Sequence, residues 1–296
     1  MRLAILFCVL IVCASPARAQ PPVLQPPAPV PQAPSTLEPD RPDVTNGTHI
    51  VDVGLLQIEF GGIFNRSGAR VHDFGTPTTF RVGLTDWLEA RMGTDGFLSS
   101  TDGTGTQSGI GNVQIGAKLR LWASPGGIPV LSVLPAINLP AASSDKGLGS
   151  GQSDFTVAFL TGTDFLTRGH VDVNYGIGLI GAGPGLRRFT QHLASVSASV
   201  EGPGSLAPYV EGFWFSRQDP GGTPVAAIDA GAIYAITPRF AIDGGLQWGV
   251  SRAAPSFSAF GGVSVIVGNI LGGHGVHARQ KQLERRNMAA ARKSGK

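Results

Sequence analysis

The sequence repeats strand-sized segments joined by connections that alternate between very short and long. The segments are about 54–65, 78–85, 87–96, 109–122, 129–139, 153–165, 169–180, 189–201, 207–216, 225–236, 238–248 and 257–268. The short connections are 85–87, 123–128, 166–169, 202–207 and 237–238, and the long ones are 66–77, 97–108, 140–152, 181–188, 216–224 and 249–256. Strict alternation of two connection lengths is typical of up-and-down barrels with one plain end and one elaborated end. It predicts an all-β fold, an antiparallel up-and-down transmembrane β-barrel of about 12 strands.

Polar and apolar residues alternate along these segments. Val113, Ile115, Ala117, Leu119 and Leu121 fall on one face of their segment, and Asn112, Gln114, Gly116, Lys118 and Arg120 fall on the other. Such a two-residue period suits a sheet with one lipid face and one polar lumen face. A half-buried sheet in a water-soluble protein has the same period, so this pattern alone leaves both interpretations open.

The aromatic residues favour the membrane interpretation. Most of them fall near segment ends: Trp87, Trp122, Phe165, Tyr209, Tyr234 and Phe240 beside short connections, and Phe64, Phe80, Phe97, Phe155, Phe189, Trp214, Phe215, Trp248 and Phe257 beside long ones. A membrane barrel carries aromatic girdles at both interfaces, whereas a soluble core concentrates its aromatic residues in the middle of strands. The lipid bilayer is therefore the expected partner.

The regions outside the barrel have distinct compositions. Residues 1–19 combine a charged start, an apolar run and the site Ala17-Arg18-Ala19, which predicts a signal peptide and export to the outer membrane of a Gram-negative bacterium. Residues 20–42 are proline-dense and predict a periplasmic linker, 43–268 the barrel, and 269–296 a basic tail. The two cysteines, Cys8 and Cys13, lie within the leader, so the mature chain has no cysteine for a disulfide or a metal site.

Charge excludes one class of partner. Only 15% of residues are charged, and most of the basic excess lies in the tail after residue 269. A basic tail on an exported chain does not indicate nucleic-acid binding, and none is expected. The oligomeric state is left open.

Several stretches resemble an outer-membrane family named for a MetA-pathway of phenol degradation. They are Asp40-Arg41-Pro42-Asp43, the segment from Gly54 to Gly61, the segment from Arg81 to Arg91, and the segment from Gly109 to Arg120. The resemblance covers about residues 38–268. It implies an outer-membrane barrel that acts as a transporter; the family's name reflects a pathway association and identifies no phenol-binding residue.

The charges expected in the lumen form two groups. Basic residues lie on the second to fourth segments (Arg81, Arg91, Lys118, Arg120), and acidic residues lie on the seventh and the ninth to eleventh (Asp172, Glu211, Asp229, Asp243). In a ring of twelve strands these groups face each other, and charged walls tune the selectivity of pores. One hypothesis is a transverse field that orients polar solutes. The alternative is local pairing that fills the lumen, such as Glu59 with Arg81 or Glu89 with Arg91.

Asp40, Arg41 and Asp43 precede the first segment at the periplasmic mouth. They indicate either a turn that leads into the first strand, which is the preferred interpretation, or an N-terminal latch that folds into the lumen.

The preferred function is that of a passive channel for small molecules, aromatic ones included, whose identity the sequence does not define. The alternative is a structural barrel with a closed lumen. No enzyme is expected because no G-x-S-x-G nucleophile motif occurs. No catalytic residue, cofactor or metal site is predicted.

Overall fold

A computed structural model describes residues 37–42, 44–123, 130–165 and 167–271, which belong to one compact unit. The strands are β1 (Leu55–Arg66), β2 (His72–Gly75), β3 (Thr78–Gly83), β4 (Leu88–Thr94), β5 (Phe97–Thr101), β6 (Thr106–Ile110), β7 (Val113–Trp122), β8 (Val130–Leu139), β9 (Asp154–Phe165), β10 (Gly169–Ile180), β11 (Phe189–Val200), β12 (Leu206–Phe215), β13 (Val225–Thr237), β14 (Phe240–Gly249) and β15 (Phe257–Asn269). A short 3-10 turn, Pro203–Ser205, precedes β12. The predicted signal peptide, most of the predicted linker and the tail beyond Leu271 lie outside the described residues.

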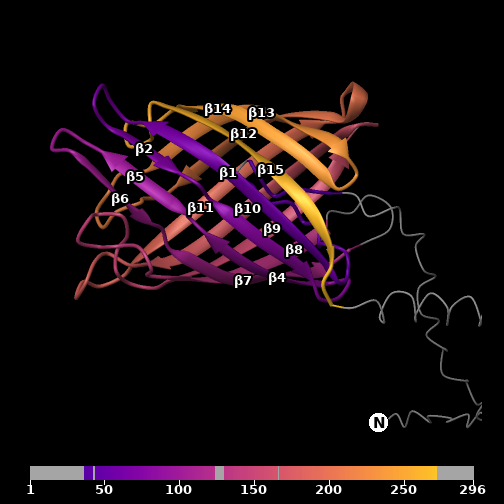
Figure 1. Ribbon diagram of the computed structural model, residues 1–296, viewed down its shortest axis with the longest axis horizontal. Helices are drawn as coiled ribbons and strands as arrows, with labels where there is room; N and C mark the ends of the chain where they lie inside the picture. The colour runs from indigo at the N-terminus through magenta and orange to yellow at the C-terminus, as the bar shows by residue number, and fades with distance from the viewer. Residues whose placement is uncertain (1–36, 43, 124–129, 166, 272–296) are drawn as a thin grey trace, which may run out of the picture. The chain divides into compact units, whose positions relative to one another are not determined.

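Twelve of the strands form a closed antiparallel barrel (Figure 1). Each barrel strand pairs with its neighbours in chain order, and β15 returns to pair with β1 over Leu55 to Arg66. Closure satisfies the backbone of both potential edge strands, which is a requirement for a sheet in lipid. The predicted all-β, twelve-stranded barrel is confirmed.

The elaborated end carries structure that the sequence pattern does not reveal. The predicted loop 66–77 contains β2, and the predicted loop 97–108 contains β5 and the start of β6. In this extension β2 pairs with β1, β5 with β2, and β6 with β5. The predicted segment 109–122 is divided at Gly111, where the Gly111 amide donates to the Gly96 carbonyl. A side chain at Gly111 would approach the Cβ of Asp95 to 2.3 Å, so only glycine allows this close contact.

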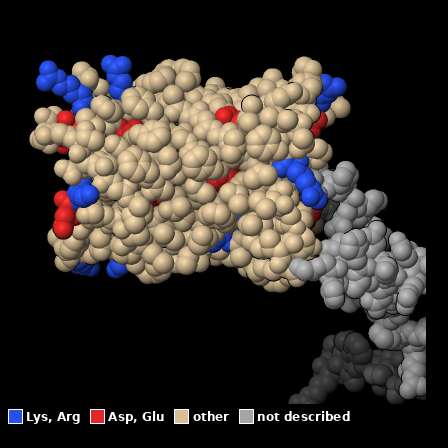
Figure 2. Space-filling model, viewed as in Figure 1, with Lys and Arg blue, Asp and Glu red and all other residues tan. Residues whose placement is uncertain are grey.

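The two faces of the barrel differ in chemistry as the alternation predicts. Phe159, Val173 and Ile177 on the outer face are each more than 40% exposed, whereas Arg81, Glu89 and Lys118 on the inner face are fully buried. Figure 2 shows a wall made largely of uncharged atoms, with Lys and Arg gathered mainly toward the two ends of the barrel. Apolar side chains thus face the lipid, and charged side chains face the lumen.

Within the part of the chain that the structure describes, no helix is long and apolar enough to cross a membrane.

Candidate functional site

Residues 37–53 are here called the inner segment; its described residues, 37–42 and 44–53, run inside the barrel before β1 begins. Leu37 donates its amide to the Pro238 carbonyl, the Ser132 hydroxyl donates to the Thr48 carbonyl, and Val53 forms a bridge with Gly83. These partners lie on different parts of the barrel wall. The expected linker extends to Pro42, whereas the structure buries Leu37 and Asp40.

Carboxylates of the wall accept backbone amides of the inner segment. Glu211 on β12 accepts the Val44 amide at 2.9 Å and the Thr45 amide at 2.6 Å. Glu89 on β4 accepts the Val51 amide at 2.9 Å, and Glu59 on β1 accepts the Asp40 amide at 3.2 Å. A segment without secondary structure needs such partners when it is buried, because unpaired backbone groups are costly. The lumen charges therefore hold the inner segment in place.

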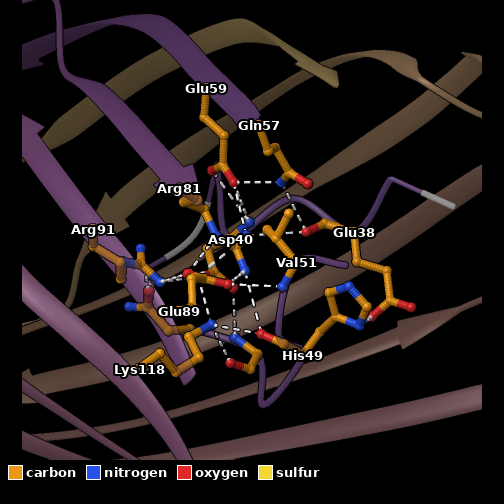
Figure 3. Close-up of polar contacts among 12 residues, drawn as sticks. Glu38, Asp40, His49, Val51, Gln57, Glu59, Arg81, Glu89, Arg91 and Lys118 are labelled. Carbon is orange, nitrogen blue, oxygen red and sulfur yellow. Dashed lines mark hydrogen bonds and ion pairs between the residues drawn. The ribbon is translucent and has the colours of Figure 1, made fainter. Parts of the chain in front are cut away.

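Asp40 is the centre of a buried ionic cluster (Figure 3). Its carboxylate lies 2.7 Å from Lys118 Nζ and 3.4 Å from Arg81 Nη1, and it pairs with Arg91. Burial by itself would raise the pKa of Asp40, but Arg81 and Lys118 outweigh burial and hold the pKa well below its usual range. Asp40 is therefore ionised at neutral pH and binds three cations at once.

Two further carboxylates complete this cluster. Arg81 Nη1 lies 2.8 Å from Glu59 Oε1, and Arg81 Nε lies 2.8 Å from Glu89 Oε1. Arg91 lies 3.4 Å from Glu89. Three carboxylates thus face three cations in a group that is almost completely excluded from water. Local pairing of this kind, which the alternative interpretation of the lumen charges expects, is present on β1, β3, β4 and β7.

Arg41 attaches the inner segment to β14, which lies next to β15 on the side away from β1. Its guanidinium donates from Nε and Nη2 to the two oxygens of Asp243 on β14, each at 3.1 Å. The guanidinium lies directly against Gly61, where an added Cβ would approach it to 2.2 Å. The missing side chain at Gly61 creates the space that this bidentate pair occupies.

The acidic residues of β10, β12 and β13 are less compensated. Glu211 and Asp229 are cross-strand neighbours, and neither forms an ion pair with Lys or Arg among the described residues. Asp172 lies 3.2 Å from His170. One oxygen of Asp229 and one of Asp172 are buried without a hydrogen-bond partner in the described part of the chain. The transverse field between the basic and acidic groups of the lumen stays a prediction. On its acidic side, fewer of the charges are paired with Lys or Arg among the described residues.

Arg120, a predicted site residue, contributes little to this network. Arg120 Nη1 approaches the Asp86 carbonyl only at 3.5 Å, and its Nε is buried without a partner among the described residues. Asp43 lies outside the described residues. The backbone role of Val44, Thr45 and Val51 is not predicted; the available signal is that proline density falls after Pro42, well before strand alternation begins at Leu55.

A cavity of about 410 Å³ lies in the lumen against the inner segment. Asp40, Arg41, Pro42 and Asn46 of that segment line it, together with the wall residues Glu59, Arg91, Gln114, Leu134, Ala136, Ala158, Leu193 and Phe215. Phe215, predicted in an outer girdle, therefore lines the lumen. One side of the cavity is ionic, and the other is largely apolar but includes Thr156 and Gln191, a combination that suits a small amphipathic molecule. Among the described residues, no group of His, Cys, Asp and Glu could hold a metal ion.

Comparison with known proteins agrees with this architecture. Residues 39–266 match the model of the family described as "Putative MetA-pathway of phenol degradation". The chain belongs to this family. A comparison with curated proteins finds no significant match.

Solved structures of outer-membrane channels share the fold of this chain. The COG4313 outer membrane channel from Pseudomonas putida F1 is 16% identical, with a TM-score of 0.57 over 76% of this chain and all of that one. The NanC porin is 9% identical, with a TM-score of 0.50 over 71% of this chain and 98% of that one. At these identities the likeness shows the fold, an outer-membrane β-barrel.

Proposed function

We propose that this family member is a passive channel of the outer membrane for small amphipathic molecules, aromatic ones included. The observation that carries the proposal is the lumen cavity of about 410 Å³, which falls in the size range of small-molecule sites, about 300–1,000 Å³. Its apolar side suits a ring or short chain. Its polar side offers Gln114, whose side chain has no hydrogen-bond partner among the described residues, beside Asn46 and Arg91.

The inner segment acts as the gate in this proposal. It crosses the lumen between the cavity and the end that carries the short connections. Many of its contacts are ion pairs and hydrogen bonds, which water can replace, and its buried apolar side chains are Leu37, Ile50 and Val51. The sequence-based hypothesis of an N-terminal latch through Asp40 and Arg41 is thereby extended to residues 37–53.

The inner segment also supports the alternative, a structural barrel that stays closed. Planar-bilayer recording of the refolded full chain distinguishes the two. A channel gives unitary currents in the wild type, or in a variant with weakened docking such as Asp40→Asn. Silence in both, with heat-modifiable migration showing that the barrel has folded, contradicts the channel proposal and favours the closed barrel.

A small-molecule readout tests the solute class. Liposomes that contain the Asp40→Asn variant are expected to admit small phenolic or benzoate solutes faster than sugars of similar mass. Leu193→Asp, which makes the apolar side of the cavity charged, should remove that preference. Equal rates for both solute classes before and after this substitution would contradict the proposed selectivity.

A further inference from the structure

The lipid-facing side of β7 to β10 contains a hollow of about 850 Å³. Its floor is a cross-strand row of short side chains, Ala117, Pro135 and Val157, followed by Ile177. Larger rows border it on both sides: Ile115, Ile137, Phe155 and Leu179 toward the elaborated end, and Leu119, Val133, Phe159 and Tyr175 toward the other. The floor and borders of this lipid-face groove are largely apolar.

Pro135 explains why the wall is hollow at this level. Proline has no amide to donate to the β7 neighbour, and the pairing between β7 and β8 lapses from Gly116–Ala136 to Leu119–Val133. Its compact ring, beside the methyl group of Ala117, leaves space between two rows of branched and aromatic side chains. The floor and both borders come from register positions fixed by the barrel, so the groove is part of the wall.

One end of the groove is polar. His192 on β11 is the register partner of Ile177 and extends the floor row. Its Nδ1 lies 2.9 Å from the hydroxyl of Tyr175, and both residues belong to the lipid-facing set of their strands. Polar groups on a lipid face are costly unless they have partners. A ligand with a polar headgroup would satisfy the remaining ring nitrogen.

Two arginines, Arg187 and Arg188, lie in the connection between β10 and β11, at the elaborated end of the barrel. The Arg188 guanidinium lies 5.6 Å from the ring centre of Phe155, a border residue of the groove, and its Nε donates to the Ser153 carbonyl at 2.9 Å. Arg187 is exposed, and neither arginine forms an ion pair among the described residues. The nearby Asp154 carboxylate accepts the Gly181 amide and the Asn138 amide instead. The guanidinium groups are therefore available to an anion.

We propose that the groove binds a phosphorylated lipid of the outer leaflet. An acyl chain occupies the floor formed by Ala117, Pro135 and Val157, and Arg187 and Arg188 bind a phosphate of the headgroup. Guanidinium groups donate paired hydrogen bonds to phosphate oxygens. The apolar groove buries an acyl chain, which a water-soluble ligand does not have. The elaborated end of such barrels faces the outside of the cell, where the outer leaflet lies.

Native mass spectrometry of the full chain in mild detergent tests this proposal. The probes are lipid A and the same disaccharide lipid after removal of both phosphates. The wild type should retain one lipid A molecule, with at least about 10-fold weaker retention of the dephosphorylated lipid, because the charge-assisted contacts are lost. The double substitution Arg187→Ala/Arg188→Ala and the groove-filling Ala117→Leu should each weaken lipid A binding by about 10-fold.

Matched controls lie on the opposite side of the ring. Arg66→Ala/Arg70→Ala removes two arginines at the same end of the barrel, and Ala230→Leu enlarges a lipid-facing alanine of β13; both should leave lipid A binding unchanged. Equal retention of the dephosphorylated lipid, or equal losses in the controls, would overturn the proposal, and so would a dimer that survives in place of the lipid complex. Heat-modifiable migration identifies any variant that fails to fold, and Arg187→Gln/Arg188→Gln then replaces the alanine variant.

Discussion

The Nζ atom of Lys118 lies 2.7 Å from the carboxylate of Asp40, although 78 residues of chain separate them. The contact joins β7 of the wall to the inner segment. Arg81 and Arg91 approach the same carboxylate from β3 and β4, so one acidic residue of the inner segment compensates cations of three strands. Asp40 thus forms more ion pairs with the wall than any other described residue of the inner segment.

Asp40→Asn is expected to weaken docking of the inner segment strongly. The substitution leaves Lys118, Arg81 and Arg91 with fewer carboxylates in a water-excluded site, and breaking a buried ion pair costs about 3 kcal/mol or more. The open fraction in planar-bilayer recordings should rise. Asp52→Asn is the matched control, because Asp52 lies in the same segment but forms no ion pair among the described residues. Equal behaviour of the two variants would contradict the role of Asp40.

Gly61→Ala should displace Arg41 from Asp243. The new methyl group would lie 2.2 Å from the guanidinium, so the bidentate pair cannot persist in its present geometry. We expect a loss of about 1–3 kcal/mol in docking, the value of a charged hydrogen-bonded contact. Gly62→Ala is the control, because its methyl group would face lipid at an ordinary 3.5 Å from Phe74. If the clash acts through Arg41, Gly61→Ala adds nothing in an Arg41→Ala background, and an additive effect there would argue against this mechanism.

Acid pH should release the inner segment through His49. Burial, followed by the charges of Arg81 and Lys118, lowers the pKa of His49 from 6.5 to about 4. Neutral His49 therefore favours the docked state, and this stabilisation is present above 6.5 and is lost as the pH falls toward 4. The shift corresponds to at most about 3 kcal/mol. The open fraction should rise less steeply in His49→Gln than in the wild type as the pH falls from about 7 to about 4. A pH profile identical to that of the wild type would exclude His49 as the titrating group.

Reversal of the acidic side should change ion selectivity. Asp229→Lys places a cation beside Glu211, in a region where no Lys or Arg of the described residues pairs with Glu211 or Asp229. The preference of the open lumen should move from cations toward anions, because rings and walls of charge set selectivity. Adding Asp243→Lys should increase the change and also remove the partner of Arg41. Reversal potentials under a salt gradient measure the ion selectivity. Values identical to those of the wild type would contradict the hypothesis of a transverse field.

The barrel was readable from the sequence because its signals are local. A strand in lipid must alternate its two faces and satisfy its backbone through neighbours, so residues such as Val113 to Leu121 reveal both the strand and its lumen side. The extra strands β2, β5 and β6 were not readable, because they extend beyond the membrane wall and have no lipid face to enforce alternation. Residues 72–75 and 97–108 therefore look like parts of long loops.

The contacts of the inner segment, in contrast to the barrel strands, could not be predicted from the sequence. The sequence by itself determined the ring of strands, the faces of Arg81, Lys118, Glu211 and Asp243, and the presence of charges at Asp40 and Arg41. Only the tertiary structure decided that Asp40 and Arg41 bind those wall residues. Residues 37–53 have no repeating pattern, and their partners are set by where barrel closure places distant side chains. The energy of each buried charge depends on that placement, so no local pattern could indicate which charges pair across the lumen.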